Sequence, residues 1–158
     1  MFDSILLVGC GNMAGAMLEG WLACGIAPHT FTIVDPVRED APGGMAISRE
    51  LPDAGRFDAI MLGVKPQILD EVVPQIAPLA GEGTIILSLL AGVELDALEA
   101  RFPDARACVR VMPNLAVSLG KAPIALATQG LDEDTRGAVL DFFLPLGTPE
   151  WVGEDAFD

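Results

Sequence analysis

Residues 9–14 read Gly-Cys-Gly-Asn-Met-Ala, with small residues at the first, third and sixth positions. Where a strand passes into a helix around a phosphate, each of these has a physical role: Gly9 permits a tight turn, Gly11 lets the backbone approach a pyrophosphate, and Ala14 lets helix and strand pack closely. Asn12 offers a polar contact to the ligand or a cap for the helix. A plain tight turn would use the same glycines, so the surrounding residues must distinguish the two interpretations.

Further polar residues follow apolar runs along the chain. Asp35 comes after "FTIV", where an acid accepts from the ribose hydroxyls in an NAD site, and Arg38 is a cation of the kind that accommodates the 2′-phosphate of NADP. Asp35-Pro36 is also typical of a turn that ends a strand. Lys65 in "GVKPQ" is either a cation at the edge of a bound cofactor or simply an exposed loop lysine. Asn114 in "VMPNLA" is a partner for nicotinamide or ribose, or a turn former.

The elements that must position these residues are visible as short apolar runs separated by helical spacing. Nearly continuous apolar runs predict buried parallel strands, and they lie at residues 4–9, 31–34, 58–64, 84–90 and 106–111. Apolar residues spaced by three and four predict helices at 13–21, 68–76 and 94–102, the second kinked or shortened by Pro74. A loop, a strand at 124–128, a helix at 132–146 and an edge strand at 149–153 follow. This alternation predicts an α/β fold with a doubly wound, mostly parallel sheet and helices on both faces.

Composition limits the classes of function. The formal net charge of −14 argues against a nucleic-acid partner and against binding to anionic membranes. The absence of a long apolar run or a basic leader predicts no membrane span and no signal peptide. The three cysteines show no metal-ligand spacing, so we expect no metal and a cytoplasmic location. Cys10 is a core or turn residue, or a thiol whose pKa a helix N-terminus lowers.

Four segments in this order and spacing, "GCGNMAGAMLEGWL", "GVKPQILDEVV", "SLLAGVELDALEARF" and "VRVMPNLAVSLGKAP", resemble the N-terminal domain of pyrroline-5-carboxylate reductase. The resemblance covers essentially the whole chain and implies a Rossmann-type NAD(P)-binding domain over residues 1–158. It implies reduction of 1-pyrroline-5-carboxylate to L-proline, in proline biosynthesis, with NADP(H) or NAD(H) as cofactor. It also implies a homo-oligomer for the full-length enzyme.

The resemblance assigns residues to the cofactor by position. The pyrophosphate falls to Gly9, Gly11, Asn12, Met13 and Ala14, and the adenosine ribose to Asp35. The remaining positions are Val64, Lys65 and Pro66 along the cofactor, and Met112, Pro113 and Asn114 at its nicotinamide end. The chain departs from the family in having Asp35-Pro36 where Asn or Ser and then Arg are usual, which puts NADPH preference in doubt. It also reads "MPNLA" where the family has "MPNTP".

The family continues into a helical C-terminal domain that builds the dimer and supplies substrate-pocket residues. We expect the catalytic residues in that domain, which these 158 residues do not include, and therefore an inactive chain on its own. Two alternatives remain open at this point. The chain is a nucleotide-binding module without catalysis, or it is the cofactor domain of a β-hydroxyacid-type dehydrogenase.

Overall fold

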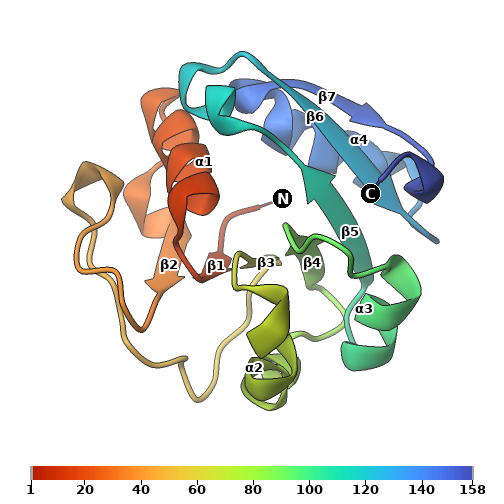
Figure 1. Ribbon diagram of the computed structural model, residues 1–158, viewed down its shortest axis with the longest axis horizontal. Coiled ribbons are helices and arrows are strands. Elements are labelled where there is room, and N and C mark those ends of the chain that lie inside the picture. The colour runs from red at the N-terminus through yellow and green to blue at the C-terminus, as the bar shows by residue number, and fades with distance from the viewer. Residues whose placement is uncertain (1, 158) are drawn as a thin grey trace.

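The computed structural model describes residues 2–157, with a seven-stranded sheet at its centre (Figure 1). The strands lie in the order β2-β1-β3-β4-β5-β6-β7. Their bounds are β1 Ile5–Val8, β2 Phe31–Val34, β3 Ala59–Leu62, β4 Ile85–Ser88, β5 Ala107–Met112, β6 Ala122–Thr128 and β7 Gly147–Trp151. The first five strands are parallel, β6 pairs antiparallel with β5, and β7 pairs parallel with β6. The predicted doubly wound, mostly parallel sheet is therefore confirmed.

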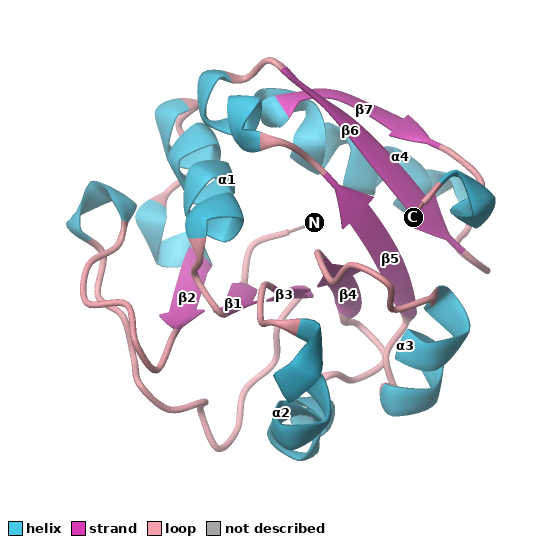
Figure 2. Ribbon diagram, viewed as in Figure 1, coloured by secondary structure: helices cyan, strands magenta, loops and turns pink. Residues whose placement is uncertain are grey.

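Four helices cover the sheet on both faces (Figure 2). They are α1 Asn12–Ala23, α2 Leu69–Ile76, α3 Leu95–Arg101 and α4 Glu133–Phe143. One apolar core joins the sheet to α1 and α4, and the other joins it to α2 and α3. Strands β1, β3 and β4 are completely buried, which explains why their sequences are continuously apolar rather than alternating.

Helices α1 and α4 are joined by an aromatic cluster around Trp21. The indole ring stacks on Phe142 with ring centroids 4.4 Å apart, and its Nε1 donates to the Phe142 carbonyl oxygen at 2.8 Å. The rings of Phe31 and Phe143 also pack against the indole, and the ring of Phe2 packs against Phe142. The cluster holds α1 in place over β1 and β2, and α1 in turn presents its first turn at the carboxyl end of the sheet.

Two connections differ from a regular alternation of strands and helices. Residues 35–58, all of them described, contain no α-helix; the backbone of Ser48 instead makes a parallel bridge to Val34. Helix α2 is eight residues long and carries Pro74 inside it, and a 3₁₀ turn continues from Ala77. The helix continues past Pro74 to Ile76, so the shortening predicted from this proline is not observed, although a proline cannot donate to the preceding turn of a helix.

The last predicted elements also form. Strand β6 begins two residues before the predicted 124, and β7 begins two residues before the predicted 149. Helix α4 carries Glu133 and Asp134 in its first turn, where acids stabilise the positive end of the helix dipole.

Candidate functional site

Gly9 makes the turn that ends β1. Its φ is +88°, and its N–H donates to the Val34 carbonyl oxygen at 2.8 Å. A Cβ at this position would lie 2.9 Å from the carbonyl group of Gly63, so β3 leaves no room for a side chain. The expectation that a glycine permits a tight turn here is confirmed, and the close contact with Gly63 adds a second reason for it.

Gly11 is the N-cap residue of α1, and the space around it is open. Its φ of −75° is available to any residue, and no heavy atom of the described chain lies within 4 Å of where its Cβ would be. Asn12 is exposed as the first residue of the helix, so its interpretation as the cap was wrong. Among the described residues no side chain caps this helix, and its N-terminus faces the open space next to Gly11.

Asp35 connects the end of β2 to the glycine turn. One carboxylate oxygen accepts from the Cys10 N–H at 2.8 Å, and the other accepts from the N–H groups of Val37 and Arg38 at 2.8 and 2.9 Å. Burial raises the pKa of Asp35, but these three hydrogen bonds and the charge of Arg38 outweigh it, so the net pKa lies below its usual value. Asp35 therefore ends the strand in a hydrogen-bonded turn and keeps its charge beside the glycines.

Two guanidinium groups lie next to this turn. Arg38 donates from Nη1 to the carbonyl oxygens of Cys10 and Gly11, at 2.8 and 3.2 Å. A Cβ on Gly15 would be 2.5 Å from that nitrogen, so the missing side chain in α1 makes room for Arg38. Arg49 donates from Nη1 to the backbone oxygens of Asp35 and Arg38.

Cys10, between the two glycines, is buried. Burial raises the pKa of its thiol and outweighs the opposing charge of Arg38. The alternative of a thiol with a lowered pKa was therefore wrong, and Cys10 belongs to the core.

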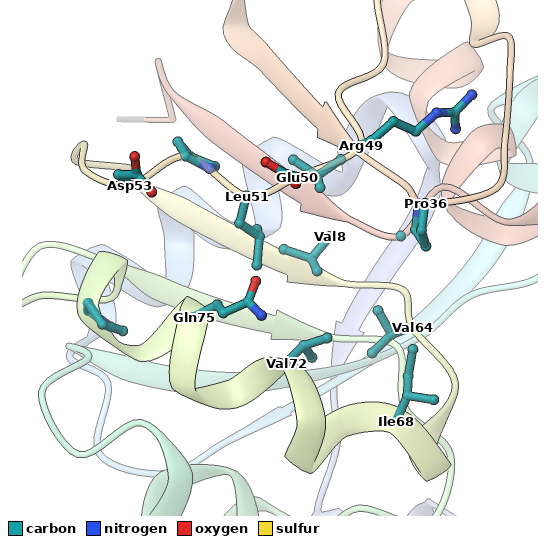
Figure 3. Close-up of a pocket in the computed structure, with 14 residues that line it drawn as sticks. Val8, Pro36, Arg49, Glu50, Leu51, Asp53, Val64, Ile68, Val72 and Gln75 are labelled. Atoms are coloured by element: carbon teal, nitrogen blue, oxygen red, sulfur yellow. The ribbon is translucent and has the colours of Figure 1, made fainter.

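A cavity of about 560 Å³ opens on one side of the glycine turn (Figure 3). Its wall is largely apolar and combines the ends of β1 and β2, the start of the β3–α2 connection and the segment 49–53. The close-up shows Leu51, Val8 and Val72 turned toward the same space, whereas the Arg49 guanidinium extends away from it. We call this cavity the β2-side hollow; it lies at the carboxyl ends of strands on both sides of β1, where the strand order reverses.

A smaller cavity of about 240 Å³ lies on the other side of the turn. It is formed at the carboxyl ends of β4 and β5, and we call it the β5-side hollow. Its lining residues are Met13, Ser88, Leu89, Leu90, Ala91, Arg110, Val111, Met112, Pro113 and Phe157. The glycine turn thus lies between two hollows, with Gly9 on the wall of one and Met13 on the wall of the other.

The predicted site residues are unevenly distributed between the two hollows at the carboxyl ends of the strands. Gly9 and Val64 line the β2-side hollow, and Met13, Met112 and Pro113 line the β5-side hollow. Ala14 is buried against Gly63. Six other predicted residues line neither hollow, namely Gly11, Asn12, Asp35, Lys65, Pro66 and Asn114. The Asn114 side chain accepts from the Ala116 N–H at 2.9 Å, which supports its interpretation as a turn former.

Sequence reasoning missed several residues of the two hollows. Segment 49–53 reaches the β2-side hollow because Ser48 pairs with β2, and no pattern in that segment indicates the pairing. Arg110 and Phe157 also went unassigned. Arg110 did carry a signal, because a charged residue inside an otherwise apolar strand sequence is buried only with a partner.

Within residues 2–157 no helix is both long and apolar enough to span a membrane. The same residues contain no group of His, Cys, Asp and Glu side chains arranged to hold a metal ion. The structure contains three free cysteines: Cys10 and Cys108 are buried, and Cys24 is exposed.

Comparison with known proteins gives a consistent result. Residues 4–92 match the family model described as "NADP oxidoreductase coenzyme F420-dependent". Pyrroline-5-carboxylate reductase from Haemophilus influenzae is 29% identical over 157 residues, which cover 96% of this chain and 58% of that protein. The resemblance predicted from the sequence is confirmed. The chain spans less than two thirds of the length of the curated relatives that it matches.

Solved structures agree on the fold. A pyrroline-5-carboxylate reductase from Coxiella burnetii superposes with a TM-score of 0.81 at 22% identity, covering 96% of this chain and 59% of that one. The Plasmodium falciparum pyrroline carboxylate reductase with NADP bound gives a TM-score of 0.78 at 19% identity, covering 95% of this chain and 57% of that one. The Rossmann-type fold is therefore shown by the observed strand order and by these neighbours.

Proposed function

Because the chain belongs to the family described as NADP oxidoreductase coenzyme F420-dependent, we propose that it is the NAD(P)H-binding domain of a pyrroline-5-carboxylate reductase. The activity proposed for the whole protein is reduction of 1-pyrroline-5-carboxylate to L-proline, a step of proline biosynthesis. The observation that carries the proposal is the family match over residues 4–92, which contain the glycine turn, Asp35 and both sides of the β2-side hollow.

The residues present fit a dinucleotide. The pyrophosphate lies at Gly11, where a Cβ would meet open space and where the N-terminus of α1 offers N–H groups and a partial positive charge. Gly9, Asn12, Met13 and Ala14 shape this turn. Two hollows flank it, as a ligand with two nucleoside halves requires.

The two halves of the cofactor are assigned by strand order. Adenosine takes the β2-side hollow, with its ring against Val64 and its ribose at the end of β2, where Val34 and Pro36 line the hollow on either side of Asp35. The nicotinamide half takes the β5-side hollow, against Met13, Met112 and Pro113. Lys65, Pro66 and Asn114 line neither hollow but directly follow the lining residues Val64 and Pro113 in the chain, and in this arrangement they meet the cofactor from outside the hollows.

When bound, the nicotinamide supplies the hydride, and the protein contributes orientation and electrostatics. The apolar wall of the β5-side hollow excludes water from one face of the ring and leaves the other face for the substrate. Asp35 orients the turn through the Cys10 N–H, and Arg38 and Arg49 provide positive charge where an NADP 2′-phosphate would lie. We propose that NADPH and NADH are both accepted.

We further propose a cytoplasmic location and a homo-oligomeric whole enzyme. The free thiols of Cys10, Cys24 and Cys108 support a reducing compartment, since disulfides form where conditions are oxidising. The oligomer follows from the family resemblance.

Two measurements test the function. Calorimetric titration of the 158-residue chain with NADPH and NADH should show binding of both, and absence of binding would contradict the cofactor assignment. The whole encoded protein, however far it extends, should oxidise NADPH when 1-pyrroline-5-carboxylate is added. Oxidation of a β-hydroxyacid with NADP⁺ instead would identify the alternative dehydrogenase, and dinucleotide binding without either reaction would identify a non-catalytic module.

A further inference from the structure

The segment after β7 forms an ion pair with a buried arginine that lines the β5-side hollow. Arg110 in β5 is only 2% exposed, and its Nη1 lies 3.2 Å from Glu154 Oε2. The Arg110 guanidinium also lies over the Phe157 ring, 4.7 Å from its centroid. Glu154 and Phe157 thus contact the same cation from one short 3₁₀ turn at Glu154–Ala156 and the residue after it.

Glu154 has a second partner. Its Oε2 accepts from the N–H of Leu95, the first residue of α3, at 2.6 Å. A buried guanidinium is stable only when its charge is paired, and the Glu154 carboxylate is itself held by a backbone donor. These contacts join β5, α3 and the C-terminal segment at one point, near the C label in Figure 1.

This point lies on the wall of the hollow that the proposed function assigns to nicotinamide. Arg110 and Phe157 both line it, together with Met13 of the glycine turn. Phe157 is 7% exposed and packs in the core formed with α2 and α3, so its position is fixed by both apolar and charged contacts.

We infer that Phe157 and Glu154 are positioning residues for the nicotinamide end of the cofactor, Phe157 as part of the pocket wall and Glu154 through Arg110. The inference rests on the proposed function. It adds that residues far from the glycine turn in sequence, in the last part of the described chain, determine how well the nicotinamide ring is held.

The test compares two ligands that share everything except nicotinamide: NADPH and 2′-phospho-ADP-ribose. In Phe157→Leu the apolar volume is largely kept but the ring over Arg110 is lost, and in Glu154→Gln only the charge is lost. Each variant should weaken NADPH binding by about fivefold while leaving 2′-phospho-ADP-ribose binding unchanged.

The fluorescence of bound NADPH should also move toward that of free NADPH, because the nicotinamide ring becomes more solvated. Asp155→Asn, an exposed acid in the same turn, is the matched control and should change neither ligand.

The outcomes separate the inference from the proposed function. Equal weakening of both ligands would show a merely structural role, and unchanged NADPH binding in both variants would show no role; either result overturns the inference while leaving the proposed function intact. A wild-type chain that binds neither ligand would overturn the proposed function, and the inference with it. Circular dichroism melting confirms that each variant is folded before titration.

Discussion

The fold requires a glycine at position 9 but not at position 11. Gly9 is surrounded by protein, and a Cβ there would lie 2.9 Å from the carbonyl group of Gly63, so the fold itself requires it. Gly11 is surrounded by open space, so the fold does not require it. Gly11 lies at the N-terminus of α1, where a ligand phosphate can bind. Because the fold does not need a glycine there, a substitution can test whether the ligand needs one without loss of structure.

Gly11→Val should abolish NADPH and NADH binding while leaving the melting temperature nearly unchanged. The valine side chain would occupy the space assigned to the pyrophosphate, and it meets no protein atom of the described chain within 4 Å of its Cβ. Calorimetric titration and thermal melting provide the two readouts. Gly81→Val is the matched control, because its Cβ also meets open space and it lies in the turn before β4, at the opposite edge of the sheet. Undiminished affinity in Gly11→Val would refute the pyrophosphate assignment.

Asp35 holds the turn, and we propose that it also influences the choice of cofactor. Its carboxylate accepts three backbone hydrogen bonds, and an asparagine would place an N–H₂ group against one of these donors. Asp35→Asn should therefore lower stability. It should also favour NADPH over NADH, because it removes an anion from the neighbourhood of the 2′-phosphate; two like charges at about 4 Å repel by about 1 to 4 kcal/mol.

The informative quantity is the ratio of the two dissociation constants, because damage to the turn affects both cofactors alike. The ratio of the NADH to the NADPH dissociation constant should rise by about fivefold or more in Asp35→Asn. Asp40→Asn, an exposed acid in the same connection, should leave the ratio unchanged. If Asp35→Asn behaves like Asp40→Asn, then Asp35 serves only the turn and does not face the ribose.

At the scale of elements, strand β5 combines a buried cation and a buried thiol on the face that packs against α3. Burial, followed by the charge of Glu99, raises the pKa of Cys108 from 9.0 to about 12. The folded state therefore retains a proton that the unfolded chain releases above pH 9. The contribution of this thiol to stability is complete below pH 9 and is lost as pH rises toward about 12.

In Cys108→Ala the free energy of unfolding should fall less steeply between these two pH values. The slope should be smaller than that of the wild type by up to about 1.4 kcal/mol per pH unit. Denaturant unfolding at a series of alkaline pH values measures the slope. The variant should also be less stable at neutral pH by about 1 kcal/mol from lost packing, which does not affect the slope. Some slope should remain, because burial raises the pKa of Cys10 as well. A slope identical to that of Cys24→Ala, at an exposed position, would contradict the assignment to Cys108.

The elements also show what could be predicted from sequence and what could not. The strands and helices were predicted because each depends on a local pattern, such as the continuous apolar residues of β3 or the apolar residues spaced by three and four in α3. The glycine turn was predicted because its sequence pattern lies within six residues, but the contact with Gly63 that excludes a side chain at Gly9 was not predicted. The bridge from Ser48 to β2 and the contacts of Glu154 with Arg110 and Leu95 depend on residues brought together only by the whole fold. Only some of the residues that line each hollow could therefore be predicted from the sequence.

At the scale of the whole molecule, negative charge and exposed apolar side chains have opposite effects on self-association. The formal net charge of −14 makes copies of the chain repel one another. Leu119 and Leu144, 72% and 56% exposed, lie on two adjacent 3₁₀ turns between β5 and β7. Exposed apolar side chains that lie close together favour contacts between molecules.

The 158-residue chain should therefore self-associate weakly through this region, and more strongly as salt screens the repulsion between copies. The double variant Leu119→Glu/Leu144→Glu should remain monomeric at every salt concentration. Val37→Glu, at an apolar residue that is 81% exposed beside the end of β2, is the control and should associate like the wild type apart from its one added charge. Sedimentation velocity over a range of protein concentrations, at low and high salt, measures the effect. A wild-type chain that stays monomeric at high salt, or a double variant that associates equally well, would show that this apolar region does not drive association.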